Sequence, residues 1–463
     1  MSDLATRTDV SRLFGRAAFG ATRADLDTWT GQPYADVVAS LFPPGPPGTT
    51  GRALQVDEVE GSAWVYGGYE NPPPTQQWWL ERMRNTPYPL EERMTLFWHD
   101  HWATAYLPPP DIGYLMAQNQ TLRLHALGSF RAMANALTVD PAMLFYLNGV
   151  ANHVNGVNEN YAREFFELFT LGVLPQVYTE TDIREAAKAL TGWLVNTGLR
   201  QASFTQARHA LGTKTVLGRT IGGYPANDAR NATEYQEVTE AALAHEGGRT
   251  ASRFLAYKLV LTFGYQPDEA NLPADPVIED VAAAIRANDA WSIKDGVRTL
   301  LLHPGWRYSD HAAGGGLVRS PIEVYVHAAK VLGLALSVTG GTGEAQAMSK
   351  TMTKAGQEVF VPPSVAGWPN GLQWLSQPTT LGRYEMLLPL FRYFRNSGLI
   401  FVTPPPASSD LAGWAAFMGL GSLTTNTTLR LQAYLANPGT ANEMDKQASI
   451  FVLLGTSPDW QVI

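Results

Sequence analysis

Two histidines, separated by one residue, lie in an aromatic stretch, FWHDHW, that covers residues 97–102. Imidazole nitrogens bind metal ions and exchange protons near neutral pH, which makes His99 and His101 the first candidates for chemistry. In a regular helix, side chains two residues apart point about 200° away from each other, so the pair reaches one ion only where the helix is distorted. Two interpretations stay open: a metal or acid–base site, or a hydrogen-bonded core histidine, His101, beside an exposed one.

A second group of polar residues lies in NENYAREFFELFTLG, residues 158–172. At about 100° per residue, Asn160, Arg163, Glu164 and Glu167 fall on one side of a helix whose remaining surface is aromatic or otherwise apolar. Two carboxylates one turn apart could bind a metal ion or exchange a proton, with Arg163 holding one of them ionised. The alternative is a narrow solvated stripe stabilised by local charge pairs.

A third candidate is His209 in QARHALGTKTVLG. The segment is typical of a loop, and we expect His209 and Lys214 to lie near the surface there. A ligand or acid–base role is open for His209, and so is a role as an ordinary loop residue. The other six histidines stand in unrelated contexts: His125, His153, His245, His303, His311 and His327.

The known catalytic signatures are mostly missing. The sequence has no HExxH zinc motif, no GxSxG nucleophile elbow, no phosphate-binding GxxxxGK[ST] loop and no GxGxxG after a strand. It also has no cysteine, which excludes disulfides, thiolate metal sites, iron–sulfur clusters and a cysteine nucleophile. A metal site would therefore use nitrogen and carboxylate ligands, which suit iron, manganese, zinc or copper and do not choose between them.

Composition narrows the class of protein further. The 42 acidic and 34 basic residues give a formal charge of -8 without a basic block, so we expect no nucleic-acid partner. No stretch reaches the roughly 18 apolar residues of a membrane span, and the first 20 residues lack the apolar core of a signal peptide. We therefore expect a soluble, cytoplasmic protein.

Helical spacing dominates the pattern of apolar residues. The segments that show it include TQQWWLERMRN, LEERMTLFWHDHWATAY, TDIREAAKALTGWLV, DPVIEDVAAAIRAN and SPIEVYVHAAKVLGLAL. Asn158 is predicted to cap the helix that begins at NENYARE, and Thr179 with Asp182 has the spacing of a capping box. The sequence thus predicts a mainly α fold: one large multi-helix globular domain.

Breaker-rich segments divide these helices. Three Pro/Gly-rich stretches, 42–51, 67–75 and 401–410, predict long loops or linkers. At most a short β-hairpin is expected, at TKTVLGRTIGG (213–223). We predict a helical domain over residues 1–400 and a C-terminal extension, 401–463, packed on it after the Pro-rich linker.

The motifs together resemble those of the DUF1800 family, a bacterial family named for its unknown function. The strings that carry the resemblance are LFGRAAFG (13–20), FWHDHWAT (97–104), LGSFRAMANALTVDPAMLFYLNG (127–149), NENYAREFFELFTLG (158–172), YTETDIREAAKALTGW (178–193), HALGTKTVLG (209–218), VRSPIEVYV (318–326) and FVPPSVAGWPNGLQW (360–374). The resemblance implies a predominantly helical protein, often encoded beside a DUF1501 protein of the alkaline-phosphatase-like class. Many members of the family look exported, and no activity comes with the name.

The resemblance also bears on the candidate residues. The family pattern includes a histidine pair matching His99 and His101, an acidic helix matching Asn158 to Asn160, Arg163, Glu164 and Glu167, and a histidine matching His209. Asp100 and Ala210 replace the asparagine and aspartate expected of the family. PPSVAGWPNG is interpreted as a folding requirement.

Two hypotheses follow. The first is a metal-dependent enzyme acting on a small molecule or carbohydrate in an aromatic-lined pocket, with oxidative chemistry slightly favoured over metal-assisted hydrolysis. Its metal ligands would be His99, His101, Glu164 and Glu167, and its catalytic residues Glu164, Arg163 and His209. The second is a non-catalytic binding or assembly protein, for example a partner of a DUF1501-like hydrolase or a carbohydrate-binding surface. An isoprenoid cyclase ranks low because an aspartate-rich motif is missing.

Overall fold

The computed structural model describes residues 3–45, 72–106, 112–173, 177–307, 317–334, 350–396 and 404–462. Over these ranges the chain is mainly helical, with two small two-stranded antiparallel sheets, which confirms the predicted fold class. No helix among the described residues is long and apolar enough to cross a membrane.

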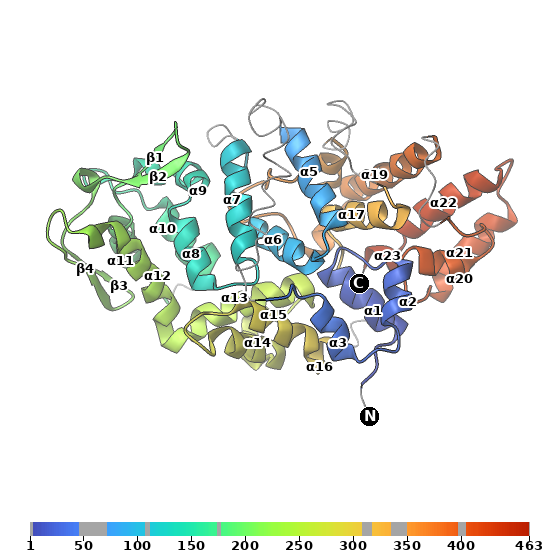
Figure 1. Cartoon of the computed structure of the whole chain (residues 1–463), viewed down its shortest axis with the longest axis horizontal. Helices are drawn as coiled ribbons and strands as arrows, with labels where there is room; N and C mark the ends of the chain where they lie inside the picture. Colours follow the sequence, from blue (N-terminus) through green and yellow to red (C-terminus); the bar gives the residue numbers. More distant parts are fainter. Residues whose placement is uncertain are drawn as a thin grey trace.

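The first half of the chain runs from the N-terminal helices through the centre of the molecule to its far end (Figure 1). The N-terminal helices are α1 (Arg7–Ala17), α2 (Arg23–Trp29) and α3 (Tyr34–Ser40). The central helices are α5 (Pro72–Asn85), α6 (Pro89–His101), α7 (Ile112–His125), α8 (Phe130–Thr138) and α9 (Pro141–Tyr146). At the far end lie η2 (Gly149–Ala151), α10 (Asn160–Glu164), the π-helical turn η3 (Phe165–Thr170), α11 (Glu180–Ala189), β1 (Trp193–Asn196), β2 (Gln201–Phe204), η4 (Gln206–Arg208), β3 (Thr213–Val216) and β4 (Arg219–Gly222).

The second half returns along the molecule to the opposite end, where the C-terminal helices gather (Figure 1). The returning elements are η5 (Ala229–Thr233), α12 (Glu234–Ala244), η6 (His245–Gly248), α13 (Arg249–Phe263), η7 (Glu269–Ala274), α14 (Pro276–Arg286), α15 (Ile293–Leu302) and α16 (Pro304–Arg307). The remaining elements are α17 (Pro321–Leu332), η10 (Gly371–Leu375), α19 (Gln377–Asn396), α20 (Leu411–Phe417), α21 (Thr425–Ala436), α22 (Glu443–Gly455) and α23 (Pro458–Gln461).

Local signals in the sequence set several helix starts. Thr179 and Asp182 form the predicted capping box, with the Thr179 hydroxyl and the Asp182 carboxylate each accepting the other residue's backbone N–H. The predicted cap of α10 is wrong in position, because Glu159 is the N-cap residue; the Asn158 side chain, one residue earlier, accepts a hydrogen bond from the Asn160 amide, 3.0 Å away. In the predicted loop 67–75, the described prolines from Pro72 onward form the first turn of α5, where missing N–H groups cost nothing.

Two β-hairpins follow one another in the sequence between α11 and α12. The predicted hairpin is confirmed as β3–β4, and its turn residues Leu217 and Gly218 both have positive φ, as a tight turn between twisted strands requires. The second hairpin, β1–β2, was not foreseen, because the periodicity of TDIREAAKALTGWLV extends a helix across Trp193. Gly192 separates helix from strand at a φ of +101°, a conformation that favours glycine.

The buried side chains form two hydrophobic clusters. We call the first the α8–α15 cluster; it also takes in residues of α1, α3, α6 and α11 to α13. The second, which we call the α17–α22 cluster, includes residues of α5, α17 and the C-terminal helices. Helix α6 contributes to both, with Phe97 and Trp98 in the first and Leu96 in the second. It therefore lies between two cores.

The C-terminal segment is bound to distant parts of the chain. Val462 pairs with Val318 in an isolated antiparallel bridge, and the Ser11 hydroxyl donates to the carbonyl of Gly419, 2.7 Å away. Trp460 stacks on His327 at a ring-centroid distance of 4.8 Å. The residues that follow the predicted linker thus pack on α1 and α17; residues 401–403 of that linker lie outside the described ranges.

Candidate functional site

Helix α6 directs its two histidines into different surroundings. The helix is regular through His101 and ends at Trp102, whose φ of -98° and ψ of 53° leave the helical region. The distortion that would bring both imidazoles to one ion is therefore missing from α6. Both side chains are buried, at 1% and 4% exposure, so the expectation that one of them is solvent-exposed is wrong.

His101 is a core residue of the α8–α15 cluster. Its Nε2 donates to the carbonyl oxygen of Phe169, 3.0 Å away, and its ring lies among aromatic side chains that include Trp98 and Phe130. Burial lowers the pKa of His101 to about 3, so the imidazole is neutral. This is the hydrogen-bonded core histidine predicted as one of the two alternatives.

His99 faces the other cluster. Its ring makes edge contacts with Trp79, Phe360 and Trp368, with centroid distances of 5.3 to 5.4 Å. Burial lowers its pKa to about 3 as well, and its Nε2 has no hydrogen-bond partner among the described residues. His99 is thus a neutral imidazole enclosed by aromatic rings.

The carboxylates of the predicted metal site lie on a different surface. Glu164 ends α10, and Glu167 lies in the π-helical turn η3. Arg163 pairs with Glu180 at 2.7 Å and approaches Glu159 and Glu167 at 3.4 and 3.7 Å, with about a third of its side chain exposed. Burial and the charge of Glu167 raise the pKa of Glu164. The stripe is a partly solvated network of charge pairs.

The four predicted metal ligands are not gathered into one site. Within the ranges that the structure describes, no three His, Asp or Glu side chains come close enough together to hold a metal ion. The environments explain why: His99 is enclosed by rings, His101 is bound to a carbonyl, and the two glutamates share Arg163. As the structure places them, these four residues do not form one metal site.

His209 is buried, which corrects its expected position near the surface. Its side chain is fully enclosed, its Nδ1 lies 3.0 Å from the carbonyl oxygen of Thr191, and its Nε2 lies 3.4 Å from a carboxylate oxygen of Glu234. Lys214, also expected near the surface, pairs with the same Glu234 carboxylate and is 2% exposed. Glu234 of α12 contacts both side chains, and His209 also packs against Phe204 of β2, contacts that a glycine-rich local sequence does not indicate.

Asp100, the residue between the two histidines, lies in a setting better suited to chemistry than that of either histidine. Asp100 accepts a hydrogen bond at Oδ1 from the backbone N–H of Trp368, 2.6 Å away. Gly367 makes this approach possible: its φ is +85°, and a Cβ there would lie 2.3 Å from Asp100 Oδ1. Burial raises the pKa of Asp100 to about 6, above the range of an ordinary aspartate.

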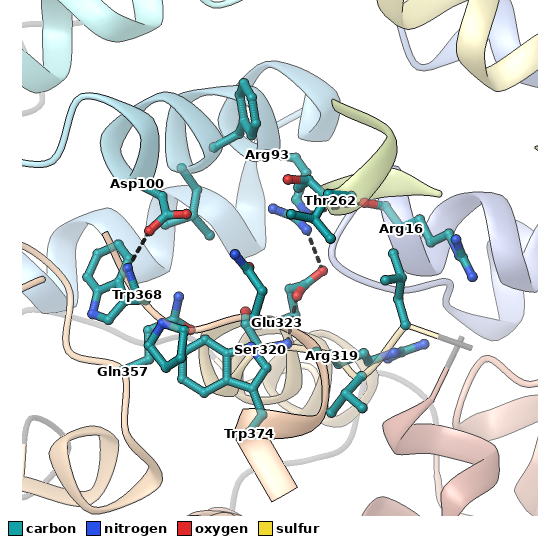
Figure 2. A pocket seen from close by; sticks show the side chains of 18 residues that line it. Arg16, Arg93, Asp100, Thr262, Arg319, Ser320, Glu323, Gln357, Trp368 and Trp374 are labelled. Atoms are coloured by element: carbon teal, nitrogen blue, oxygen red, sulfur yellow. Dashed lines mark hydrogen bonds and ion pairs between the residues drawn. The ribbon is translucent and has the colours of Figure 1, made fainter. Parts of the chain in front are cut away.

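Asp100 lines a pocket between the two clusters (Figure 2). The cavity has a volume of about 60 Å³, and α1, α6, α13, α17 and the 368–374 segment form its walls. Asp100 and Trp368 lie at one end of the lining in this view, and Arg16 and Arg319 lie at the other, with their guanidinium groups pointing away from its middle. The polar and aromatic residues that line it include Arg16, Arg93, Asp100, Thr262, Arg319, Ser320, Glu323, Gln357, Trp368, Asn370 and Trp374.

A buried ion pair stands between these two ends. Arg93 Nη2 lies 2.8 Å from Glu323 Oε1, and both side chains are 7% exposed. The other carboxylate oxygen of Glu323 accepts the backbone N–H of Ser320, 2.8 Å away, in the capping box of α17. Glu323 is thus engaged on both oxygens, which holds α17 against α6.

Four of the strings that carry the family resemblance converge on this pocket. LFGRAAFG supplies Arg16, FWHDHWAT supplies Asp100, VRSPIEVYV supplies Arg319 and Glu323, and FVPPSVAGWPNGLQW supplies the 368–374 segment. In the sequence these strings lie as far apart as residues 13 and 374, so only the fold brings them together.

The model of a family described as "Protein of unknown function (DUF1800)" matches residues 12–462. The chain belongs to the DUF1800 family. The match includes the C-terminal segment from 404 onward, along with all four strings at the pocket. No curated protein and no solved structure matches the chain.

Sequence reasoning missed this pocket for an identifiable reason. In the sequence, Asp100 stands out only as a replacement for an expected asparagine, and PPSVAGWPNG indicates a folding requirement. The available signal was the set of charged residues inside otherwise apolar DUF1800 strings, namely Arg16, Asp100, Arg319 and Glu323. A buried charge costs free energy unless it is paired or used, which makes such residues informative.

Proposed function

We propose that this DUF1800 protein is an enzyme that binds a small polar molecule in the pocket between α6 and α17 and transfers a proton at the Asp100 carboxyl group. The observation that carries the proposal is the convergence of four distant family strings on one cavity that holds a partly buried aspartate. Motifs whose polar residues meet at a cavity favour function over folding alone.

The chemistry follows from the setting of the carboxyl group. A pKa of about 6 keeps both the protonated and the ionised form of Asp100 accessible near neutral pH, as a general acid or base requires. The Trp368 amide binds Oδ1 and so sets the orientation of the carboxyl plane. Proton transfer from or to a bound molecule would then use a group that is already in place.

The rest of the pocket provides contacts for orienting a ligand. Trp368 and Trp374 offer flat apolar walls, and Gln357 and Asn370 offer amide groups. Gln357 is itself held in position, because its side-chain oxygen accepts the Ile322 N–H, 3.0 Å away. A few placed polar groups among aromatic walls are typical of small-molecule sites.

The metal-dependent enzyme predicted from the sequence stays a prediction and is not the function we propose. Its four ligands have separate surroundings, and no step at Asp100 requires them. The observations on His101 and Arg163 instead support structural roles: His101 donates to a backbone carbonyl, and Arg163 pairs with Glu159 and Glu167. Those residues support the fold under either function.

The experiment is a search for proton exchange. The purified protein is incubated in D₂O with mixtures of sugars, polyols, hydroxy acids and amino acids, and ¹H NMR follows deuterium incorporation and new products. We expect wild type to change at least one compound and Asp100→Asn to leave it unchanged. Asp140→Asn is the matched control, because burial also raises the pKa of Asp140, to about 7, and Asp140 lies outside the pocket. Equal activity of wild type and Asp100→Asn would contradict the proposal.

A further inference from the structure

The helical walls of the pocket are firmly joined to one another. Arg93 of α6 pairs with Glu323 of α17 at 2.8 Å, and its Nε donates to the carbonyl of Arg16 in α1, 3.2 Å away. Nη1 of Arg16 in turn donates to the carbonyl of Phe263 at the end of α13, 3.0 Å away. Separating these four helices would break hydrogen bonds from buried charged groups, which are the strong ones.

The remaining wall is held by much less. It belongs to residues 362–373, which we call the pocket strap. Among the described residues, the bond from the Trp368 N–H to Asp100 is the only hydrogen bond that joins the strap to another part of the chain (Figure 2). The other hydrogen bonds of the strap lie within it.

The strap is fixed just beyond its two ends. The carbonyl of Phe360 accepts the Tyr106 N–H, 2.8 Å away, and the carbonyl of Trp374 accepts Arg383 Nε at 3.3 Å. Between these ends, Gly371 has a φ of +60° and nothing within 4 Å of the position that a Cβ would take, so the backbone has room to turn there. The strap can therefore swing while both ends stay in place.

One side chain holds the strap closed. Trp368 is 5% exposed in the α17–α22 cluster, and its ring centroid lies 5.4 Å from that of His99. Many other side chains of the strap pack little, and the exposed ones are Pro363, Ser364, Ala366, Asn370, Leu372 and Gln373. A buried ring and a hydrogen bond thus make the closed form dominant, with little else to oppose a local opening.

The closed cavity is small for a substrate. Its volume of about 60 Å³ has room for about five water-sized molecules. Most sugars and hydroxy acids are larger, so a wall must move before they enter. The strap is the wall that meets this need, because a single hydrogen bond holds it.

We infer that residues 362–373 form a gate over the pocket, latched by the Trp368 N–H on Asp100, and that the ligand enters when this gate opens. The inference rests on the proposed function only in that both use the same pocket. The latch and the proposed proton-transfer group share one carboxyl group. Closure after ligand entry therefore restores the orientation of Asp100 before a proton moves.

Because the sequence has no cysteine, one introduced thiol reports the opening. Leu96 lines the pocket and is 3% exposed, so Leu96→Cys should react with a maleimide only while the gate is open. The matched control is Leu387→Cys, at a position that is 0% exposed in the same cluster and is not part of the pocket lining. Under native conditions we expect Leu96→Cys to react at least about tenfold faster, because labelling of Leu387→Cys needs a larger unfolding event.

Asp100→Asn tests the latch. An amide oxygen accepts the Trp368 N–H more weakly than a carboxylate, so this change should speed labelling of Leu96→Cys at least about threefold and leave Leu387→Cys unaffected. Equal labelling of the two cysteines, or a change that speeds neither or both of them, overturns the gate. The readout needs no substrate, so a failure to find proton exchange would contradict the proposed function and leave the gate standing.

Should Leu96→Cys not fold, hydrogen exchange in wild type decides. The backbone N–H groups of Trp368 and Ile322 are both bonded to side-chain oxygens, of Asp100 at 2.6 Å and of Gln357 at 3.0 Å. Ile322 belongs to the helical wall α17, so it serves as the control. After correction for intrinsic rates, the Trp368 amide should exchange at least about tenfold faster. Equal protection of the two amides overturns the inference.

Discussion

His99 and His101, which are separated by one residue on α6, pack into different hydrophobic clusters. His99 lies against Trp79, Phe360 and Trp368, whereas His101 is bonded to Phe169 on the other side of the helix. The regular helix separates the two imidazoles and turns Asp100, between them, toward the pocket. The FWHDHW stretch thus joins two cores and carries the proposed proton-transfer group at their boundary.

Burial of neutral His99 should make the protein less stable in mild acid. Its folded pKa is lowered to about 3, so its contribution to stability is present above the unfolded value of about 6.5 and is lost progressively as pH falls toward 3. His99→Phe keeps an aromatic ring but has no group to protonate. Relative to wild type, its free energy of unfolding should therefore rise by about 1 to 2 kcal/mol when the pH falls from 7.5 to 5. Urea unfolding at both pH values measures this, and parallel pH dependences would contradict it.

Glu92 should be among the most sensitive polar residues of the core. It is 0% exposed, and its carboxylate accepts from Trp79 Nε1 at 3.0 Å, Arg82 Nε at 2.6 Å and Arg123 Nη2 at 2.9 Å. Glu92→Gln leaves two arginines without their countercharge, and we expect a loss of about 3 to 5 kcal/mol in the free energy of unfolding.

The control for Glu92 is Glu81→Gln, which removes a part-exposed partner of Arg84 and should cost less than about 1 kcal/mol. Because the arginines lower the pKa of Glu92 to about 2 despite its burial, its contribution is present above about pH 4.5 and is lost as pH falls toward 2. Chemical unfolding of the two variants should separate them clearly, and similar losses would show that Glu92 is not the centre of the network.

Gly367 should be needed for the close approach of the 368–374 segment to Asp100. Alanine at a φ of +85° costs about 1 kcal/mol in backbone strain, and its Cβ would also collide with the Asp100 carboxylate. We expect Gly367→Ala to lose about 3 kcal/mol in total. Gly212→Ala has a similar φ of +94° with nothing within 4 Å, so it should show the strain alone. Equal losses in thermal unfolding would mean that the contact with Asp100 is unimportant.

The charged stripe of α10 and η3 should tolerate substitution. Glu164→Gln and Glu167→Gln change partly solvated charge pairs, so each should alter the free energy of unfolding by less than about 1 kcal/mol. We also expect metal content, measured by plasma mass spectrometry on untagged protein, to be the same in wild type, Glu164→Gln and His99→Ala. Stoichiometric metal that disappears in both folded variants would instead support the metal site predicted from the sequence.

Local signals in the sequence predicted most of the fold because they act over a few residues. Thr179 and Asp182 specify a helix start, and the β-branched residues and glycines of TKTVLGRTIGG indicate a hairpin. The β1–β2 hairpin was missed because its strands are four residues long and follow a helical pattern without a break before Gly192. Length and caps distinguish helix from strand poorly over so short a segment.

The pocket could not be predicted from spacing because its partners are far apart in the chain. Asp100 meets the Trp368 amide 268 residues away, and Arg319 meets the C-terminal Trp460. Periodicity places a residue on one face of its own helix but does not say what packs against that face. The same limit explains His209, whose burial depends on Glu234 from another element.

The proposed proton transfer depends most directly on the ionisation of Asp100, which the ¹³C carboxyl resonances of aspartate-labelled protein report. The Asp100 signal is assigned as the one that Asp100→Asn removes, and its shift is followed from pH 4 to pH 8. We predict a midpoint at about 6, the value expected for a carboxyl group poised for proton transfer in this pocket. A midpoint near the ordinary aspartate value of about 4 would contradict the proposed role of Asp100 in proton transfer.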